Sequence, residues 1–339
     1  MTLFLIPFLL ALFGSLFLSW LFSLPGFRFS NPRIGSRHSH SGMLSRFGGV
    51  AIMAAFFFVI GVDQNLVMTR PLWGLVAGGI FVLLSGIADD FFELDWRTQL
   101  LFQVALGVII YFFSIRIDFI TNPFGGIIDF SESSVAGLSF VVTLLWLLLL
   151  INAVNWLDGA DGLLGSVGSI AAITIFIVSL RPEVNQPPIA LVSSALLGAI
   201  IGFLILNVPP ARIFAGTTGS MFIGFSLAVL SMIAGSKIAT TVLVLALPIV
   251  DAIMVALWRI FSGDSVFHPD ERHIHYRLMK LGWSSTKIFL TITLFTALIA
   301  AIALQASPIS KIIAFLCALS IFILFFFWLE RALKKRQSL

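Results

Sequence analysis

Four side chains with amide or carboxylate oxygens recur at every third position of the segment 150–165, LINAVNWLDGADGLLG. They are Asn152, Asn155, Asp158 and Asp161. Each step of three residues on an α-helix drifts by about 60°, so neighbouring members share a face. Gly159 and Gly162 then loosen the helix, and the converging oxygens suit a hard cation or a polar ligand. The spacing does not match an EF-hand, and a structural cap is the alternative interpretation.

Two adjacent carboxylates, Asp89 and Asp90, end a long apolar run in the segment 85–96, SGIADDFFELDW. Their mutual repulsion would be relieved by a divalent cation, by a proton or by a cationic partner. A helix end that is marked by solvated acids is the simpler alternative.

Three other segments carry groups that suit phosphate. The loop AGTTGS, residues 215–220, offers backbone N–H groups at glycines and at a helix start, although an ordinary N-cap is the alternative. The stretch 261–278 holds a cationic cluster whose arginines suit bidentate phosphate contacts, and its two histidines lack the third ligand that zinc requires. The basic loop 33–52 adds Arg37, His38 and Arg46.

The composition places these groups in a membrane protein. Of 339 residues, 59% are hydrophobic and 11% are charged, against about 25% charged in a typical soluble domain. A soluble enzyme, a nucleic-acid-binding module and a disordered chain are therefore excluded. The single cysteine, Cys317, allows neither an intrachain disulfide nor a zinc cluster.

We expect an all-α, polytopic fold of about eleven membrane-spanning helices, because a bilayer core requires about 20 mainly apolar residues per helix. The expected spans are about 2–24, 47–62, 72–88, 98–115, 135–153, 163–180, 188–206, 219–234, 238–258, 286–306 and 309–330.

The distribution of basic residues predicts the orientation of this bundle. With the N-terminus outside, 15 of the 20 Lys and Arg residues fall in cytoplasmic segments, as the positive-inside rule requires. The C-terminus is then cytoplasmic, and the basic tail 331–339 contacts anionic lipids. The chain forms a single domain, 1–339, whose active site is built by the cytoplasmic loops at about 25–46, 89–97, 154–162, 207–218 and 259–285. Carboxylates for a cation and loops for phosphates on one face predict phosphoryl transfer to or from a lipid-borne substrate.

Five motifs occur in a characteristic order: RFGG at 46–49, ADDFFELDWR at 88–97, NAVNWLDGADGL at 152–163, GTTGSMFIGF at 216–225 and DERHIHYRL at 270–278. With them the chain resembles the polyprenyl-phosphate N-acetylhexosamine-1-phosphate transferase family over nearly its whole length. That family includes phospho-N-acetylmuramoyl-pentapeptide transferase, but the RHIHYRL loop looks more like the N-acetylhexosamine branch.

The resemblance implies an enzyme of the bacterial cytoplasmic membrane. It would transfer the sugar 1-phosphate of a UDP-N-acetylhexosamine, such as UDP-GlcNAc, to undecaprenyl phosphate, and UMP would leave. The product would start a cell-envelope polysaccharide. Mg²⁺ is the implied cofactor, with Mn²⁺ as the alternative, and a homodimer is considered.

The resemblance also implies roles for individual residues. The catalytic candidates are Asp89, Asp90 and Asp158, of which Asp89 is favoured. The metal candidates are Asn155, Asp158 and Thr217. The substrate-binding candidates are Arg46, Asn152, Asn155, Asp161, Gly219, Ser220, Arg272, His273, His275 and Arg277.

Two positions depart from the family pattern. Thr217 stands where the family has an aspartate that binds Mg²⁺, and Tyr276 replaces the third histidine of His-x-His-His. The threonine removes a negative charge from the metal site and predicts weaker or rearranged metal binding. Direct attack of the lipid phosphate on the β-phosphorus is favoured over a covalent intermediate on Asp89.

Two alternatives remain from the sequence. One is a transporter or flippase for an anionic solute, for which the mid-span Asp251 is the clearest sign. The other is a catalytically degenerate homologue that binds the lipid without turnover, and Thr217 is its only support.

Overall fold

The computed structural model describes residues 2–27, 44–122, 125–130, 136–235, 238–263 and 272–337. Arg37 and His38, which the sequence placed near the site, lie outside the described residues. The α-helices are α1 (Thr2–Phe22), α2 (Gly48–Val62), α3 (Arg70–Phe92), α4 (Trp96–Phe112), α5 (Ala136–Asn155), α6 (Leu163–Ser179), α7 (Pro187–Asn207), α8 (Gly216–Ile233), α9 (Ile238–Val244), α10 (Ala246–Ser262), α11 (Ile274–Lys280), α12 (Ser285–Gln305) and α13 (Pro308–Gln337). Short 3-10 helices, η1 (Pro25–Phe27) and η2 (Trp156–Gly159), and an antiparallel pair of strands, β1 (Phe119–Thr121) and β2 (Ile127–Asp129), complete the fold.

Every span that the sequence predicts is occupied by an apolar helix or helix pair. Among the described residues, seven helices are long and apolar enough to cross a membrane, and a bent pair would make an eighth. The shorter helices α2, α4 and α6 occupy three further predicted spans. The fold is therefore an all-α, multi-pass membrane bundle, and the full count of eleven crossings stays a prediction.

The predicted span 238–258 is a bent pair of helices instead of one straight helix. The range 238–258 contains α9 and α10, which meet at an angle of 77°. Pro248 lies in the first turn of α10 and has no N–H to donate to the carbonyl of Val244. The helix therefore breaks between the two elements instead of running through.

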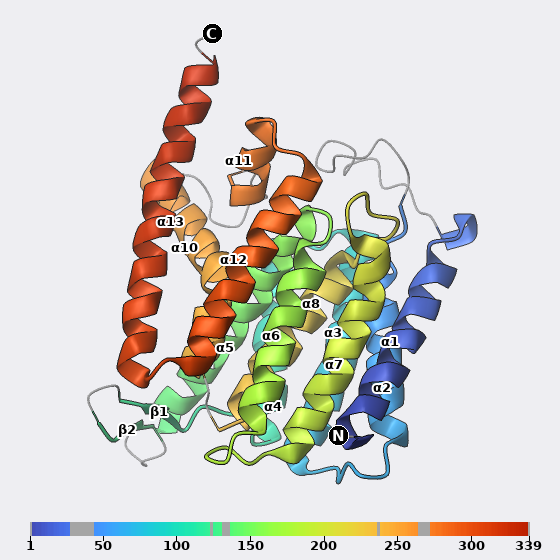
Figure 1. Cartoon of the computed structure of the whole chain (residues 1–339). Coiled ribbons are helices and arrows are strands. Elements are labelled where there is room, and N and C mark those ends of the chain that lie inside the picture. Colours follow the sequence, from blue (N-terminus) through green and yellow to red (C-terminus); the bar gives the residue numbers. More distant parts are fainter. Residues whose placement is uncertain are drawn as a thin grey trace.

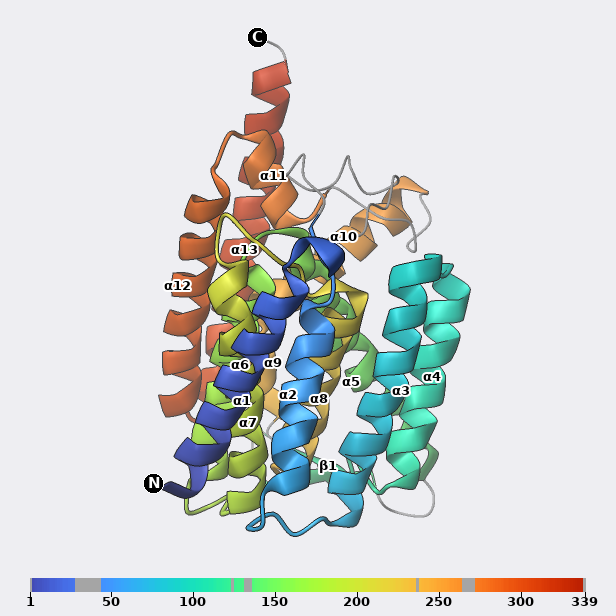
Figure 2. The same ribbon diagram turned by 90° about the vertical axis from the view of Figure 1, so that its right-hand side faces the viewer.

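Helix α8 forms the centre of the bundle and packs against α2, α3 and α5 (Figures 1 and 2). It carries no charged residue, and nearly all of its side chains are buried. Glycines allow the neighbouring backbones to approach closely. A Cβ atom on Gly49 would lie 2.2 Å from the Gly219 nitrogen, and one on Gly86 would lie 2.5 Å from the Thr218 Cα. These contacts fix where α8 begins relative to α2 and α3.

Helices α1 and α7 cross through small residues in the same way. A Cβ atom on Gly198 would lie 2.2 Å from the Phe8 carbonyl oxygen, and one on Gly202 would lie 2.3 Å from that of Leu12. Ser15 and Ser19 on α1 are fully buried. This small-residue contact is the packing mode that membrane helices favour, because apolar burial does not drive association in lipid.

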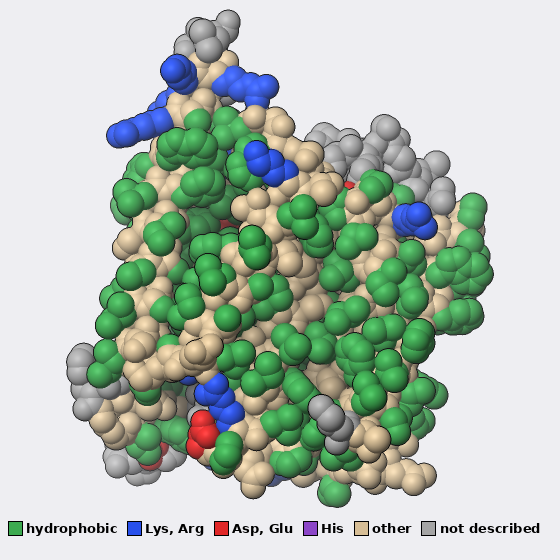
Figure 3. Space-filling view, in the orientation of Figure 1, with side chains coloured by type: hydrophobic (Ala, Val, Ile, Leu, Met, Phe, Trp, Pro, Cys, Tyr) green, Lys and Arg blue, Asp and Glu red, His purple; other side chains and the backbone are tan. Residues whose placement is uncertain are grey.

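The outer surface fits a bilayer. Figure 3 shows hydrophobic side chains over the middle of the bundle, while Lys and Arg gather at the end that carries the C-terminus. Large apolar side chains such as Phe13, Phe17 and Leu294 are more than half exposed. The N-terminus and the C-terminus lie at opposite ends (Figure 1), as an odd number of crossings requires.

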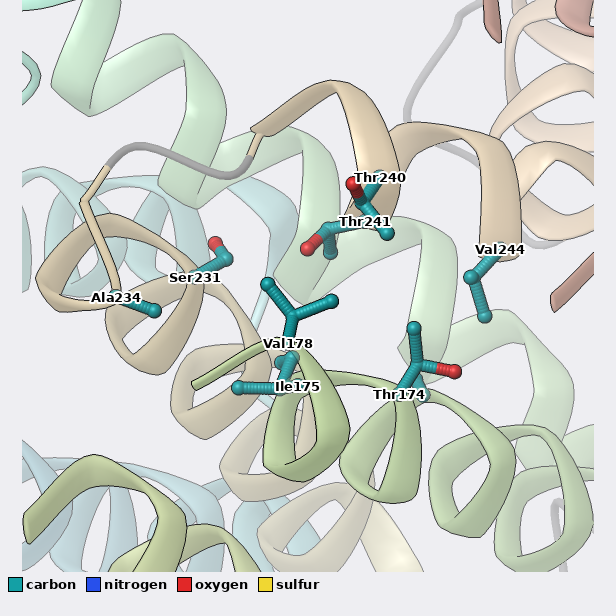
Figure 4. Close-up of a pocket in the computed structure, with 9 residues that line it drawn as sticks. Thr174, Ile175, Val178, Ser231, Ala234, Thr240, Thr241 and Val244 are labelled. Atoms are coloured by element: carbon teal, nitrogen blue, oxygen red, sulfur yellow. The ribbon is translucent and has the colours of Figure 1, made fainter. Parts of the chain in front are cut away.

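Near the N-terminal end, a cavity of about 10 Å³ lies between α6, α8 and α9 (Figure 4). Its lining includes Thr174, Ile175, Ser231 and Thr241, and none of the described residues that line it is charged. A space of this size holds at most about one water molecule, so it is a packing gap rather than a ligand site.

Candidate active site

The predicted chemistry-bearing residues meet where α8 begins. The last part of the predicted basic loop 33–52 pairs with the segment before α8. The Phe214 N–H donates to the Ser45 carbonyl at 2.8 Å, and the Gly49 N–H donates to the Ala215 carbonyl at 2.9 Å. Gly216 has a φ of 68°, and a Cβ atom there would lie 2.8 Å from both the Arg46 carbonyl and Asp90 Oδ2. Only glycine allows this turn, which brings Arg46 to the start of α8.

Asp90 binds the N-terminus of α8. Its carboxylate accepts hydrogen bonds from the Thr217 N–H at 2.8 Å, the Thr218 N–H at 3.1 Å and the Thr218 hydroxyl at 2.8 Å. An anion is stabilised at a helix N-terminus by the helix dipole and by the free N–H groups. The sequence assigned these N–H groups to a substrate phosphate, but the protein's own carboxylate occupies two of them.

Asp158 approaches the same helix end from η2. Its carboxylate interacts with the N–H groups of Ala215 and Gly216, and it lies within electrostatic range of Arg46 and Asp90. Arg46 also interacts with Asp90, so one guanidinium serves both carboxylates. Two acids and one base from three segments thus form a compact polar group at one end of an apolar bundle.

Asp89 points away from its neighbour Asp90. Its Oδ1 accepts hydrogen bonds from the Leu94 N–H at 3.0 Å and from the Gln99 side chain at 2.8 Å. The repulsion between the adjacent acids is therefore relieved by separate sets of donors. Asp95, in the turn between α3 and α4, caps α4. Hydrogen bonds from the Thr98 hydroxyl and N–H lower the pKa of its carboxyl.

The two asparagines on α5 have different surroundings. Asn155 accepts a hydrogen bond from the Ser220 hydroxyl, which ties α5 to α8 beside Asp158. Asn152 donates to the Gln103 side-chain oxygen at 2.8 Å and to the Leu148 carbonyl at 2.8 Å. Asn155 therefore belongs to the polar group, while Asn152 links α5 to α4 one turn away.

Asp161 is buried, with 3% of its surface exposed, and accepts a hydrogen bond from the Ala211 N–H at 3.2 Å. Asn207 supports the same loop, because it accepts from the Gly162 N–H at 3.0 Å and donates to the Ile213 carbonyl at 2.8 Å. The observed role of Asp161 is to hold the loop before α8, and its predicted contact with the nucleotide stays a prediction. Gly219, another predicted substrate-binding residue, allows the close contact between α2 and α8.

His273 and His275, at the start of α11, are held in place by contacts with α10 and η2. His273 Nδ1 lies 2.8 Å from Asp251 Oδ2, and the Ile274 N–H donates to Asp251 Oδ1 at 3.1 Å. The centre of the His273 ring lies 4.8 Å from that of the Trp156 ring. The His273 and His275 rings are nearly parallel, with their centres 6.1 Å apart. The sequence singled out Asp251 as a mid-span acid, but nothing in the sequence indicated His273 as its partner.

Gly159 brings the second histidine close to Asp158. A Cβ atom on Gly159 would lie 2.4 Å from His275 Nε2 and 2.8 Å from the Tyr276 hydroxyl. The His275 and Tyr276 rings are themselves 4.1 Å apart. The residue after Asp158 must therefore be a glycine for the histidine segment to reach the polar group.

Arg277 is directed toward α13 instead. Its Nη1 lies 3.4 Å from Glu330 Oε2, its Nε donates to the Arg272 carbonyl at 2.5 Å, and its guanidinium lies 3.9 Å from the centre of the Phe326 ring. The structure thus brings together Arg46, Asp90, Asn155, Asp158, Thr217, Ser220, His273 and His275, and it places Asp89, Asn152, Asp161 and Arg277 in supporting contacts.

Sequence reasoning did not find the side chains that support these acids and amides. Gln99, Gln103 and Asn207 each bond a predicted site residue or its loop. Each is a single amide in an apolar or loop segment, so its spacing carries no signal.

The oxygen donors suit Mg²⁺ by type. Among the described residues, no three or more of His, Cys, Asp and Glu form a metal-binding group. Mg²⁺ usually takes one or two carboxylates together with substrate phosphates, so such a group is not required. Asp158, Asn155 and Thr217 carry side-chain oxygen atoms of the type that Mg²⁺ prefers.

Comparison with known proteins identifies chains that this protein resembles. The model for glycosyl transferase family 4 matches residues 72–235. A probable undecaprenyl-phosphate N-acetylglucosaminyl 1-phosphate transferase of Bacillus subtilis (strain 168) is 31% identical over 284 residues, which cover 81% of this chain and 77% of that protein. The undecaprenyl-phosphate alpha-N-acetylglucosaminyl 1-phosphate transferase of Escherichia coli (strain K12) is 28% identical over 280 residues, which cover 80% of this chain and 74% of that protein.

A third relative is named for a decaprenyl phosphate. The decaprenyl-phosphate N-acetylglucosaminephosphotransferase of Mycobacterium tuberculosis (strain ATCC 25618 / H37Rv) is 29% identical over 296 residues, which cover 78% of this chain and 72% of that protein. These matches confirm the resemblance that the motifs carry. The chain belongs to the polyprenyl-phosphate N-acetylhexosamine-1-phosphate transferase family.

Proposed function

We propose that the protein transfers N-acetylglucosamine 1-phosphate from UDP-N-acetylglucosamine to undecaprenyl phosphate and releases UMP. The observation that carries the proposal is the meeting of Asp90, Asp158, Arg46 and the histidine pair at one end of an apolar bundle. A lipid phosphate acceptor and a soluble nucleotide donor can meet only at such a membrane surface. The relatives named above act on polyprenyl phosphates.

In this reaction an oxygen of the lipid phosphate attacks the β-phosphorus of the donor, and the bond to the α-phosphate oxygen breaks. The acceptor is mostly a dianion at neutral pH, because its second pKa is near 6. The acceptor therefore needs no obligatory base, and Asp89 serves the site by fixing the turn after α3 through Leu94 and Gln99. Arg46 offsets the negative charge of the diphosphate, and His273 and His275 offer ring nitrogens for hydrogen bonds beside it.

We propose Mg²⁺ as the cofactor, held by Asp158 and Asn155 with Thr217 beside them, and Mn²⁺ as the ion that could replace it. When bound, the ion would offset charge on the diphosphate oxygens. Thr217 offers a neutral hydroxyl where a carboxylate would bind the cation more tightly. The metal site is accordingly weaker than one with two carboxylate ligands.

For the orientation, we propose eleven crossings with the N-terminus outside and the polar end of the bundle in the bacterial cytoplasm. The basic residues support this arrangement, because those on α13 and around α11 gather at the end that carries the site (Figure 3). The UDP-sugar would then reach the site from the cytoplasm.

A panel assay tests this function. Purified protein is incubated with undecaprenyl phosphate, Mg²⁺ and a series of UDP-sugars, and release of UMP is measured. We expect the highest rate with UDP-N-acetylglucosamine and no UMP when the lipid is omitted. Folded protein that releases no UMP with any donor would contradict the proposal and support a lipid-binding homologue or a transporter.

A further inference from the structure

Two amide side chains, Gln103 on α4 and Asn152 on α5, form a reciprocal pair inside the bundle. Asn152 Nδ2 donates to Gln103 Oε1 at 2.8 Å, and Gln103 Nε2 donates to Asn152 Oδ1 at 3.3 Å. Gln103 is 4% exposed, and the neighbouring Leu106 and Ile151 are fully buried. An amide in such apolar surroundings costs free energy unless it is hydrogen-bonded, so each side chain holds the other in place.

The backbone carbonyl of Leu148 fixes the direction of this pair. A carbonyl oxygen only accepts hydrogen bonds, and Asn152 Nδ2 lies 2.8 Å from it. The nitrogen of the Asn152 amide therefore faces Leu148, and its two N–H groups donate to Leu148 and to Gln103. Both N–H groups of Asn152 are thus engaged within the protein, which argues against the substrate contact that the sequence predicts for this residue.

The pair connects two segments that carry site residues. On α4, Gln99 lies one turn before Gln103 and donates to Asp89 Oδ1 at 2.8 Å. On α5, Asn155 lies three residues after Asn152 and is hydrogen-bonded to α8. Residues four positions apart lie on the same side of a helix. One side of α4 therefore bonds both the acidic end of α3 and the amide-bearing end of α5.

Helix α8 holds a different side of α5 by close packing. A Cβ atom on Gly224 would lie 2.8 Å from the Ile151 Cα and from the Leu150 carbonyl oxygen. Helix α5 is thus in direct backbone contact with α8, and the amide pair sets its position toward α4. The last turn of α5, which leads into η2 and Asp158, is therefore fixed from two sides.

We propose that Gln103 is a positioning residue for the transfer reaction, and that Asn152 acts through Gln103 instead of contacting the substrate. This inference rests on the proposed function. The amide pair fixes the last turn of α5 and thereby holds Asn155 and Asp158 at the start of α8. A small displacement of such groups lowers the rate, because catalysis depends on side chains that are held in a productive geometry.

A double-mutant cycle on UMP release by the purified full chain tests this role. Gln103→Leu and Asn152→Leu each remove one amide and leave its partner unpaired, whereas the double variant removes both. We expect kcat to fall by about tenfold in each single variant and by about the same factor in the double variant. The two single variants should also change KM for the UDP-sugar equally, because they break the same pair.

Two further variants separate positioning from general stability. Ser231→Ala removes a hydrogen bond from Trp146 Nε1 of α5 to the far end of α8. We expect this control to keep the wild-type kcat even where its melting temperature falls as far as that of Gln103→Leu. The exchange Gln103→Asn/Asn152→Gln rebuilds an amide pair from the opposite helices, and we expect kcat to recover to within about threefold of wild type.

Three results would overturn the proposal. Losses that multiply to about a hundredfold in the double variant, or a higher KM for the UDP-sugar in Asn152→Leu alone, would assign Asn152 to the substrate. An equal loss of kcat in Ser231→Ala would show that activity follows stability. A folded exchange variant that recovers no activity would show that the amide pair is not what positions α5.

The wild-type protein distinguishes this inference from the proposed function. A folded wild type that releases no UMP contradicts the transferase function itself. An active wild type whose kcat is unchanged by Gln103→Leu contradicts only the positioning role.

Discussion

At the scale of single residues, the sequence identified most of the acids and bases at the site but not their partners. Asp90 bonds the backbone of Thr217, 127 positions away, and Asp251 holds His273 from another helix. Spacing along the chain reports which side chains share a helix face, and it contains no information about which other helix that face meets. The opposite directions of Asp89 and Asp90 were therefore not predictable.

The departure at position 217 leads to a prediction about the cofactor. Replacing Thr217 with Asp adds a carboxylate beside Asp158 and Asn155, and the number of charged ligands sets the affinity of a site for a hard cation. We expect the Mg²⁺ concentration for half-maximal UMP release to fall by about tenfold. Thr217→Asn is the neutral control of matched size. An unchanged or higher Mg²⁺ concentration for half-maximal UMP release in Thr217→Asp would show that position 217 does not contact the metal.

Asp251 is predicted to act as a positioning residue for His273. The Asp251→Asn variant keeps the size of the side chain but loses the charged hydrogen bond, which is typically worth about 1.5–3 kcal/mol. We expect kcat/KM for the UDP-sugar to fall by about tenfold to a hundredfold, with little change in KM for the lipid. Steady-state kinetics with each substrate varied in turn measure this. Equal losses for both substrates would indicate general disruption of the fold.

At the scale of elements, hydropathy predicted the helices well and the loops poorly. The expected span 163–180 is observed as α6 (Leu163–Ser179), because an apolar run ended by polar residues leaves few alternatives. The short helix α11 inside the expected loop 259–285 was missed, since its stability comes from contacts with α10, α12 and α13. The bend between α9 and α10 was also missed, although Pro248 was its visible signal.

The contact between α1 and α7 gives a prediction about stability. Gly202→Ala places a Cβ atom 2.3 Å from the Leu12 carbonyl oxygen, and overpacking of this kind typically costs about 1–3 kcal/mol. Gly61→Ala on α2 is the matched control, because no atom outside its own helix backbone lies within 4 Å of the added Cβ. We expect a lower melting temperature for the first variant only, measured by thermal unfolding in detergent. Equal melting temperatures would show that α1 shifts freely on α7.

At the scale of the whole molecule, the fold separates an apolar belt from one polar end. Basic composition and loop charges predicted that the chemistry would lie at a single face. The acids and Arg46 meet beside the histidine segment that begins α11. Helix α11 lies at the end that carries the C-terminus (Figure 1). The contact of Arg277 with Glu330 was not predictable, because the two residues are 53 positions apart in the chain.

In the proposed reaction the sugar moves together with one phosphate. The most direct measurement uses a UDP-N-acetylglucosamine donor that carries tritium in the sugar and radioactive phosphorus at the β-position, with undecaprenyl phosphate as acceptor. We predict that both labels enter the extracted lipid in equal amounts, that UMP is released in the same amount, and that Asp158→Asn abolishes all three. Tritium in the lipid without the β-phosphorus, accompanied by release of UDP, would contradict the account.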